Sequence, residues 1–120
     1  MKGYLFLEYP ACSTCRKAKK WLDEQKVNYT DRHIVEERPT CEEWKIWFER
    51  SGLPLRKFFN TSGLLYKSMQ LKEKLDGMSE EKQLELLASD GKLVKRPLVI
   101  GEDFVLVGFK PEEWKTVLLK

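Results

Sequence analysis

The chain has 120 residues, of which 42% are hydrophobic and 12% aromatic, and its 22 Lys and Arg against 19 Asp and Glu give a net charge of +3. This length fits one compact domain, and the composition excludes collagen-like, coiled-coil and largely disordered chains. The basic residues form no run with interleaved aromatics, so we expect no direct contact with DNA or RNA.

The first part of the chain predicts a strand–helix–strand unit. Tyr4–Leu7 are four apolar or aromatic residues in a row, typical of a buried strand. This run is too short for a signal peptide or a membrane span, so we expect a cytoplasmic protein without membrane contact. From about residue 13 to residue 26, apolar residues at helical spacing predict an amphipathic helix with Ser13 or Thr14 as its N-cap. Val27–Ile34 predicts a second strand, parallel to the first because a right-handed crossover joins them.

The middle of the chain is predicted to be mostly helical. Residues that favour helix starts and ends delimit three stretches: one capped by Thr40 and closed by Gly52, one over residues 55–75 that breaks near residues 60–63, and one capped by Ser79 and closed by Gly91. The stripe formed by Trp44, Trp47 and Phe48 has the spacing of a buried helix face rather than of a partner-binding ridge.

The last part of the chain predicts a hairpin and a closing helix. Leu98–Ile100 and Phe104–Val107 are β-rich and a short turn separates them, and Pro111 suits the first turn of a helix. The resulting order, β-α-β, then helices, then β-β-α, indicates an α/β protein with a thioredoxin-like fold and a four-stranded mixed sheet. We expect one domain over residues 1–120, with thioredoxin-like halves at about 1–35 and 95–120 and a helical insertion at about 36–94.

The spacing of Cys12 and Cys15 favours thiol chemistry. Cys12 lies just before a predicted helix, whose unpaired N–H groups and partial positive charge are expected to lower the pKa of the thiol. Arg16, one turn later, adds to this potential if its side chain turns back toward the loop. Cys15 is close enough to attack a mixed disulfide at Cys12, so we assign a nucleophile and a resolver. The alternative is that both cysteines are ordinary small hydrophobic residues.

Two other segments have both a functional and a structural interpretation. Arg96–Pro97 opens the third predicted strand, where a cis bond would bring backbone next to Cys12 and Arg96 could hold a thiolate or an oxyanion. The alternative is a surface Arg before a strand-edge Pro. The segment 60–63, Asn-Thr-Ser-Gly, could line the cysteine pocket and is equally a helix break.

Zinc is the remaining chemical possibility, since three cysteines and one histidine total four potential ligands. The spacing argues against it, because His33 and Cys41 stand apart across a strand end and a helix start instead of forming a short-spaced pair. We therefore predict no metal site and assign no role to Cys41. The chain has three cysteines, and this small, odd number also does not fit a disulfide scaffold.

Four segments together resemble the ArsC/Spx family, and the match runs almost end to end. They are Y-P-A-C-S-T-C-R-K-A at 9–18, F-N-T-S-G-L-L-Y at 59–66, K-R-P-L-V-I at 95–100 and V-G-F-K-P-E-E-W at 107–114. The resemblance implies a reactive Cys12 with Arg96 and a cis Pro97 beside it. The arsenate reductases of the family surround one Cys with three arginines. Arg96 matches one of these positions, whereas Asn60 and Lys110 occupy the other two.

The second cysteine is instead what Spx-type members carry. Their C-x-x-C toggles between dithiol and disulfide, and they contact the RNA polymerase α subunit. The resemblance therefore leaves three alternatives: an ArsC-like thiol–disulfide reductase, an Spx-type redox-switched regulator, and an arsenate reductase linked to glutathione and glutaredoxin.

We predict the first of these, a monomer in which Cys12 is the nucleophile, Cys15 the resolver and Arg96 the third catalytic side chain. No bound cofactor is expected, and glutathione, glutaredoxin or thioredoxin would be the reductant. The expected partner is a small thiol or a redox protein. The residues expected to line the site are Ser13, Thr14, Arg16, Asn60, Pro97 and Lys110.

Overall fold

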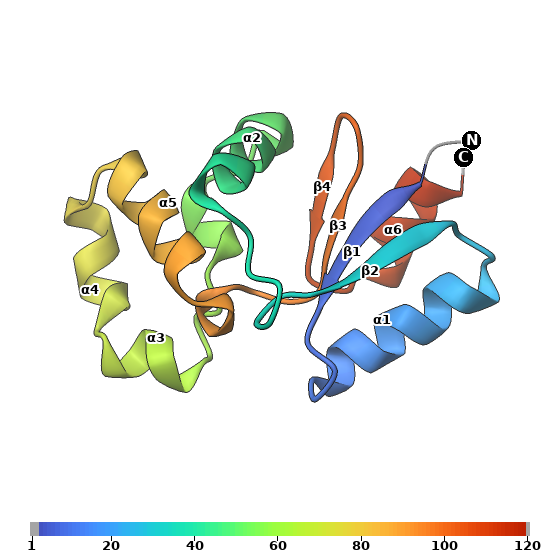
Figure 1. Cartoon of the computed structure of the whole chain (residues 1–120), viewed down its shortest axis with the longest axis horizontal. Coiled ribbons are helices and arrows are strands. Elements are labelled where there is room, and N and C mark those ends of the chain that lie inside the picture. The colour runs from blue at the N-terminus through green and yellow to red at the C-terminus, as the bar shows by residue number, and fades with distance from the viewer. Residues whose placement is uncertain (1–2, 120) are drawn as a thin grey trace.

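A four-stranded mixed sheet organises the molecule, whose computed structural model describes residues 3–119 (Figure 1). The strand order is β2-β1-β3-β4, with β1 parallel to β2 and antiparallel to β3, and β3 and β4 form the predicted hairpin. The strands are β1 (Tyr4–Glu8), β2 (Tyr29–His33), β3 (Leu98–Ile100) and β4 (Val105–Val107). The α/β class and the thioredoxin-like arrangement predicted from the element order are confirmed.

Two helices cover one face of the sheet. They are α1 (Ser13–Glu24), which connects β1 to β2, and α6 (Pro111–Leu118), which follows β4. Because side chains alternate along a strand, Phe6 and Val99 point toward these helices and pack with Leu22 and Trp114 in a buried cluster. We call this the α1/α6 cluster.

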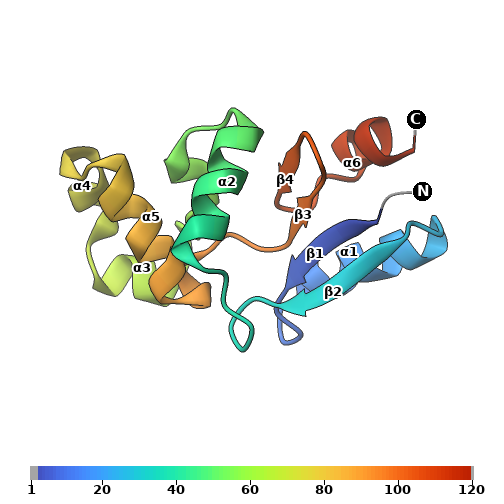
Figure 2. The same ribbon diagram turned by 45° about the horizontal axis from the view of Figure 1, so that its top comes forward.

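The predicted helical insertion packs against the opposite face. In Figures 1 and 2 its helices lie across the sheet from α1 and α6, with α2 beside β4. Leu7 and Leu98 point to this side and join a second buried cluster that contains Trp44 and Phe58. The insertion consists of α2 (Cys41–Ser51), η1 (Leu55–Phe58), α3 (Leu64–Ser68), α4 (Leu71–Lys74), η2 (Leu75–Gly77), α5 (Glu80–Ser89) and η3 (Gly91–Leu93), where η denotes a 3-10 helix.

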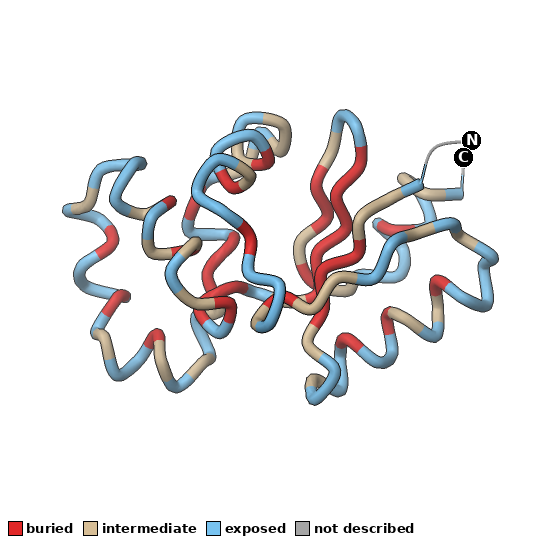
Figure 3. The backbone as a smooth tube through the Cα atoms, in the orientation of Figure 1, coloured by how far each residue is buried: buried red, intermediate tan, exposed pale blue. Residues whose placement is uncertain are grey.

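Buried residues lie on both sides of the sheet (Figure 3). They run along the central strands and along the faces of the helices that look toward the sheet or toward the middle of the insertion. Within residues 3–119, no helix has the length and the apolar character needed to cross a bilayer.

Two predicted helix boundaries are wrong, each for a physical reason. The N-cap of α1 is Cys12 rather than Ser13 or Thr14, because the Cys12 sulfur accepts the backbone N–H of Cys15. Gly91 does not close α5, which ends at Ser89. A Cβ at Gly91 would lie 2.3 Å from the carbonyl oxygen of Ile34, so glycine permits a close approach of two chain segments there.

Candidate active site

Cys12 lies at the junction between β1 and α1, beyond the carboxyl end of the inner strand β1. A turn after β1 is closed by the Cys12 N–H, which donates to the Tyr9 carbonyl at 2.9 Å. The extended backbone of Cys12 then aims its sulfur at the first turn of α1, where the Cys15 N–H donates to it at 3.4 Å. The nucleophile predicted from the sequence thus caps the helix with its own sulfur, and a negative charge there is favoured by the helix N-terminus.

The surroundings of Cys12 favour its thiolate. Partial burial raises the pKa of Cys12, but the hydrogen bonds from the Cys15 N–H and thiol, the charge of Arg96 and the Thr14 N–H outweigh it, so the pKa lies below its ordinary value. The side chain of Arg16 turns back toward the loop, and its guanidinium donates to the Pro10 carbonyl at 3.0 Å. In this position Arg16 fixes the turn that presents Cys12.

The surroundings of Cys15, in contrast, favour its neutral thiol. Its side chain is fully buried, and its sulfur accepts the backbone N–H of Tyr9 at 3.5 Å. The pKa of Cys15 is raised to about 12, mainly by burial; the hydrogen bond and negative charge of Cys12 also raise it, whereas the Tyr9 N–H and the charge of Arg96 lower it. The pair therefore consists of a half-buried sulfur whose ionised form is favoured and a buried thiol that stays protonated at neutral pH.

Arg96 lies beside both sulfurs, and its guanidinium sits over the ring of Tyr9, 5.1 Å from the ring centroid. Within the described part of the chain, its Nε and Nη1 are buried and have no hydrogen-bond partner. Buried guanidinium donors normally bind an acceptor, so these two atoms are suited to an anionic group that enters the site. The Arg96–Pro97 bond is cis, as the resemblance implied.

A pocket of about 350 Å³ opens onto Cys12. Two backbone contacts bring its walls together: Lys95 N–H donates to Phe58 O at 2.8 Å, and Gly108 N–H donates to Pro97 O at 2.9 Å. The first joins the insertion to the strand side of the site, and the second holds the turn before α6. The pocket is lined by Cys12, Thr14, Asn60, Lys95, Arg96, Gly108, Phe109 and Lys110.

The pocket contains five of the residues named from the sequence, namely Cys12, Thr14, Asn60, Arg96 and Lys110. It does not include Ser13, Arg16, Cys15 or Pro97. Pro97 is buried and contributes its carbonyl to the wall-forming contact, whereas Ser13 is exposed. Lys95, Gly108 and Phe109 were missed, although all three lie within the segments that carry the family resemblance, at 95–100 and 107–114.

The other potential zinc ligands lie in different settings. Cys41 is exposed in the first turn of α2. The ring of His33 packs edge-on against Tyr9, with 5.6 Å between the ring centroids, and its Nδ1 accepts the backbone N–H groups of Val35 and Glu36. Over residues 3–119, His, Cys, Asp and Glu side chains do not gather in a group of three or more that could hold a metal ion.

Comparison with known proteins places nearly the whole chain in one family. The sequence model of the ArsC family matches residues 7–117. Protein YusI of Bacillus subtilis (strain 168) is 56% identical over 110 residues, which cover 92% of this chain and 93% of YusI. The regulatory protein MgsR of the same organism is 31% identical over 108 residues, which cover 90% of this chain and 84% of MgsR.

A solved structure agrees with the sequence matches. The crystal structure described as an ArsC family related protein from Bacteroides fragilis superposes with a TM-score of 0.92 at 63% identity and covers 96% of this chain and 97% of its own. The chain with the capped Cys12, the buried Cys15 and the cis Arg96–Pro97 bond is a member of the ArsC family.

Proposed function

We propose that this protein is a thiol–disulfide reductase in which Cys12 attacks and Cys15 resolves. The observation that carries the proposal is the asymmetry of the pair, with a low-pKa sulfur opening onto a pocket and a buried, protonated sulfur one turn along the same helix. A lowered pKa increases the fraction of thiolate at neutral pH, and a thiolate is the attacking species in disulfide exchange.

In the first step, the Cys12 thiolate attacks one sulfur of a substrate disulfide. The S–S bond of the substrate breaks, a Cys12–substrate mixed disulfide forms, and the second half of the substrate leaves as a thiolate. Arg96 has unpartnered buried donors near the sulfur, so we assign it the role of stabilising the Cys12 thiolate before attack and the leaving thiolate afterwards.

In the second step, Cys15 attacks the Cys12 sulfur of the mixed disulfide. Two of the interactions that raise the pKa of Cys15 come from the Cys12 thiolate, and both disappear when Cys12 is bonded to the substrate. Cys15 then loses its proton to the departing substrate thiolate and forms the Cys12–Cys15 disulfide. Two electrons have passed from the protein dithiol to the substrate, and glutathione, glutaredoxin or thioredoxin would restore the dithiol.

The test follows reduction of 2-hydroxyethyl disulfide, with glutathione and glutaredoxin as the source of electrons; because both react with this disulfide themselves, turnover means the rate above that of the same mixture without the protein. We expect Cys12→Ser to abolish turnover, and Cys15→Ser to accumulate a mixed disulfide at Cys12 that mass spectrometry detects. Cys41→Ser is the matched control, since Cys41 is exposed on α2, and it should react as the wild type does. Turnover that survives in Cys12→Ser would refute the proposal.

Arsenate is the natural comparison substrate, because Lys95, Arg96 and Lys110 give the pocket a positive lining. Only Arg96 among these has the planar fork of donors that binds an oxyanion in two places. We therefore expect arsenate reduction, coupled to the same electron source, to be much slower than disulfide reduction. Arsenate turnover that equals disulfide turnover would assign the protein to the arsenate reductases instead.

A second candidate function is a redox-switched regulator, and the similarity to MgsR favours it because that relative is described as a regulatory protein. In this case the Cys12–Cys15 disulfide would change the surface around the pocket and alter binding to a partner such as RNA polymerase. Co-purification with polymerase that requires oxidation, and that Cys12→Ser abolishes, would support this function. Binding of polymerase that is equal in both redox states would count against it.

A further inference from the structure

A second hollow adjoins the Cys12 pocket. It has a volume of about 420 Å³, and Lys95 belongs to the walls of both. The two hollows also share one stretch of backbone, because Asn60 lines the first and its neighbours Phe59 and Thr61 line the second. We call the two together the basic groove; the second hollow is lined by Pro54, Arg56, Lys57, Phe59, Thr61 and Lys95.

The basic groove carries charge of one sign. Among the described residues that line it, five are cationic and none is acidic; the cations are Arg56, Lys57, Lys95, Arg96 and Lys110. The chain as a whole has nearly balanced charge, with 22 basic and 19 acidic residues, so composition does not account for this separation. Lys57, Lys95 and Lys110 are exposed, which leaves their ammonium groups accessible from solvent.

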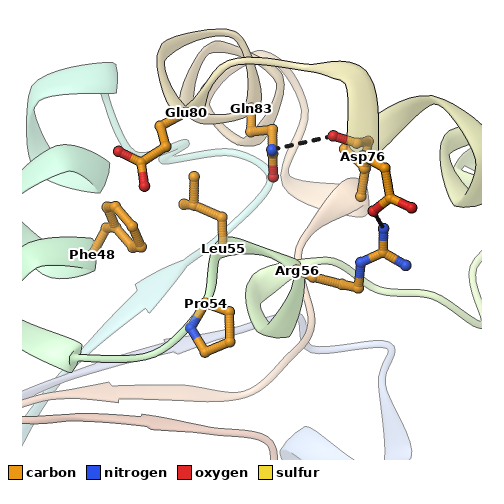
Figure 4. A pocket seen from close by; sticks show the side chains of 8 residues that line it. Phe48, Pro54, Leu55, Arg56, Asp76, Glu80 and Gln83 are labelled. Carbon is orange, nitrogen blue, oxygen red and sulfur yellow. Dashed lines mark hydrogen bonds and ion pairs between the residues drawn. The ribbon is translucent and has the colours of Figure 1, made fainter.

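A neighbouring hollow of about 300 Å³ shows the contrast (Figure 4). It lies between α2, η1 and α5, and its lining mixes Arg56 with Asp76 and Glu80. Arg56 forms an ion pair with Asp76, and Gln83 donates to the Leu75 carbonyl at 3.3 Å. Arg56 is therefore partly neutralised from this side, and the unopposed charge of the basic groove comes mainly from its lysines and Arg96.

We propose that the basic groove binds an acidic segment of a partner protein, whose disulfide is thereby delivered to Cys12. This inference rests on the proposed function and names the substrate class of the same site. The second hollow extends the binding surface beyond what a small disulfide would occupy in the first. Complementary charge over such a surface raises the association rate and selects the partner, and Pro54 and Phe109 add apolar contact.

The aromatic side chains of the groove favour a polypeptide over a nucleic acid. Single-stranded nucleic acids are held by exposed aromatic faces on which bases stack. Phe59 is only 1% exposed, and Phe109 packs edge-on against Trp114 with 4.9 Å between ring centroids. The groove thus offers five cations but only one partly exposed ring, that of Phe109, and this suits carboxylates spaced along a peptide better than a series of stacked bases.

The experiment compares three peptides of equal length that each contain one cysteine as a mixed disulfide with 5-thio-2-nitrobenzoate. The cysteine is flanked by glutamates, by serines or by lysines, and release of the coloured thiol by the reduced full chain gives the second-order rate constant. At low salt, we expect the glutamate peptide to react about tenfold faster than the serine peptide and the lysine peptide to react slowest. High salt should remove most of this difference.

Charge-reversal variants test whether the basic groove is the surface that selects the glutamate peptide. Lys57→Glu should lower the rate ratio of glutamate to serine peptide by about threefold or more. Lys72→Glu is the matched control, since Lys72 is an exposed lysine on α4 outside the groove, and it should keep the wild-type ratio. The salt dependence of the wild type tests the same point without any variant.

Each outcome decides the proposal. Equal rates for the glutamate and serine peptides, while 2-hydroxyethyl disulfide still reacts, would overturn the acidic-partner inference and leave the reductase intact. Equal effects of Lys57→Glu and Lys72→Glu would show that overall charge, and not the groove, selects the peptide, and would also overturn it. A single-stranded oligonucleotide that competes at physiological salt more strongly than the glutamate peptide would assign the groove to nucleic acid.

Discussion

Single residues explain why two cysteines of the same helix turn behave differently. Cys12 is in the cap position, where backbone N–H groups and Arg96 favour a negative charge. Cys15 is three residues further on, within the core side of α1, where burial favours the neutral thiol. The helix itself thus separates the roles, because its first turn places one sulfur at the open end and the other against the sheet.

Arg96→Met tests the contribution of the guanidinium to the acidity of Cys12. Methionine keeps apolar contact with the Tyr9 ring but removes the positive charge, so the pKa of Cys12 should rise. The alkylation rate of the reduced protein, followed across pH, should titrate at a higher midpoint, and each unit of increase lowers the thiolate fraction below the midpoint about tenfold. Lys17→Met, which removes a positive charge at an exposed position of α1, should shift the midpoint less. An unshifted midpoint in Arg96→Met would exclude this role.

Glu8 makes the stability of the protein depend on pH. Its side chain is 6% exposed, and burial, followed by the hydrogen bond and charge of Asp31, raises the pKa of Glu8 to about 7 from its ordinary 4.5. The fold therefore prefers protonated Glu8, and the free energy of unfolding should decrease as the pH rises from about 4.5 to about 7. Asp31 has a lowered pKa and a 2.6 Å ion pair with Lys19, so its own effect lies at lower pH.

Glu8→Gln introduces an amide that can donate to Asp31, as protonated Glu8 can, and it removes the titrating carboxyl. We expect this variant to exceed the wild type in the free energy of unfolding by about 1–3 kcal/mol at pH 8, and to lose the decrease between pH 4.5 and 7. Urea unfolding at several pH values measures both effects. Glu85→Gln, on the exposed side of α5, serves as the control and should follow the wild-type pH profile.

At the scale of elements, close contacts join the insertion to the sheet. The residue pair Phe59 and Val94 forms an isolated antiparallel bridge, which sets Asn60 and Lys95 at the pocket. Immediately before this bridge, η3 begins at Gly91 against the chain that leaves β2. These contacts, rather than any one helix, fix the side of the site that the insertion contributes.

Gly91→Ala tests the close contact between η3 and the end of β2. Its Cβ would lie 2.3 Å from the Ile34 carbonyl oxygen, so backbone must move, and we expect a loss of about 1–3 kcal/mol in the free energy of unfolding. Gly77→Ala is the matched control, because nothing lies within 4 Å of its added Cβ, and it should stay within about 1 kcal/mol of the wild type. Equal stability of the two variants in urea unfolding would contradict this account.

At the scale of the whole molecule, two buried clusters share the same strands. Neighbouring residues of β1, Phe6 and Leu7, belong to different clusters, and so do Val99 and Leu98 of β3. Neither face of the sheet can lose its packing without exposing strands on which the other depends. We therefore expect the thioredoxin-like halves and the insertion to unfold together.

A pair of tryptophan substitutions tests this coupling. Trp114 Nε1 donates to the Gly108 carbonyl at 3.0 Å, whereas Trp44 Nε1 is buried without a hydrogen-bond partner among the described residues. Trp114→Phe should therefore destabilise the protein by about 1–3 kcal/mol more than Trp44→Phe. Far-UV circular dichroism and amide exchange should report one coincident transition for each variant. Separate transitions for residues of α1 and of α5 would show that the insertion unfolds on its own.

The sequence alone predicts the elements better than their ends. Periodicity and turn residues identify all four strands and the helices that follow Thr40, Ser79 and Pro111, because these patterns are local. The cap of α1 was misassigned because a thiol is a weaker acceptor than the hydroxyls of Ser13 and Thr14. The role of Gly91 depends on a carbonyl that lies far away in the sequence, so no local pattern reveals it.

In the candidate site too, some residues can be predicted from local motifs and others only from the folded chain. Cys12, Arg96 and Lys110 follow from motifs, and the structure places them around one pocket. Lys95 and Phe109 enter the site through the backbone contacts that link residues 58 to 95 and 97 to 108, which are properties of the folded chain. No local pattern in the sequence indicates that Glu8 is buried, since the burial of a carboxyl at the end of β1 is a property of the folded chain.

Phe109 links the pocket to two tryptophans, whose fluorescence can therefore report on what the pocket binds. It lines the pocket and at the same time contacts the rings of Trp21 and Trp114, with centroids 6.1 and 4.9 Å away. A molecule that displaces this phenyl ring would change the environment of both indoles and hence their fluorescence. Trp44 and Trp47 emit from the other side of the sheet, so replacing both with Phe would leave a signal from the site alone, and occupancy could be followed without a label.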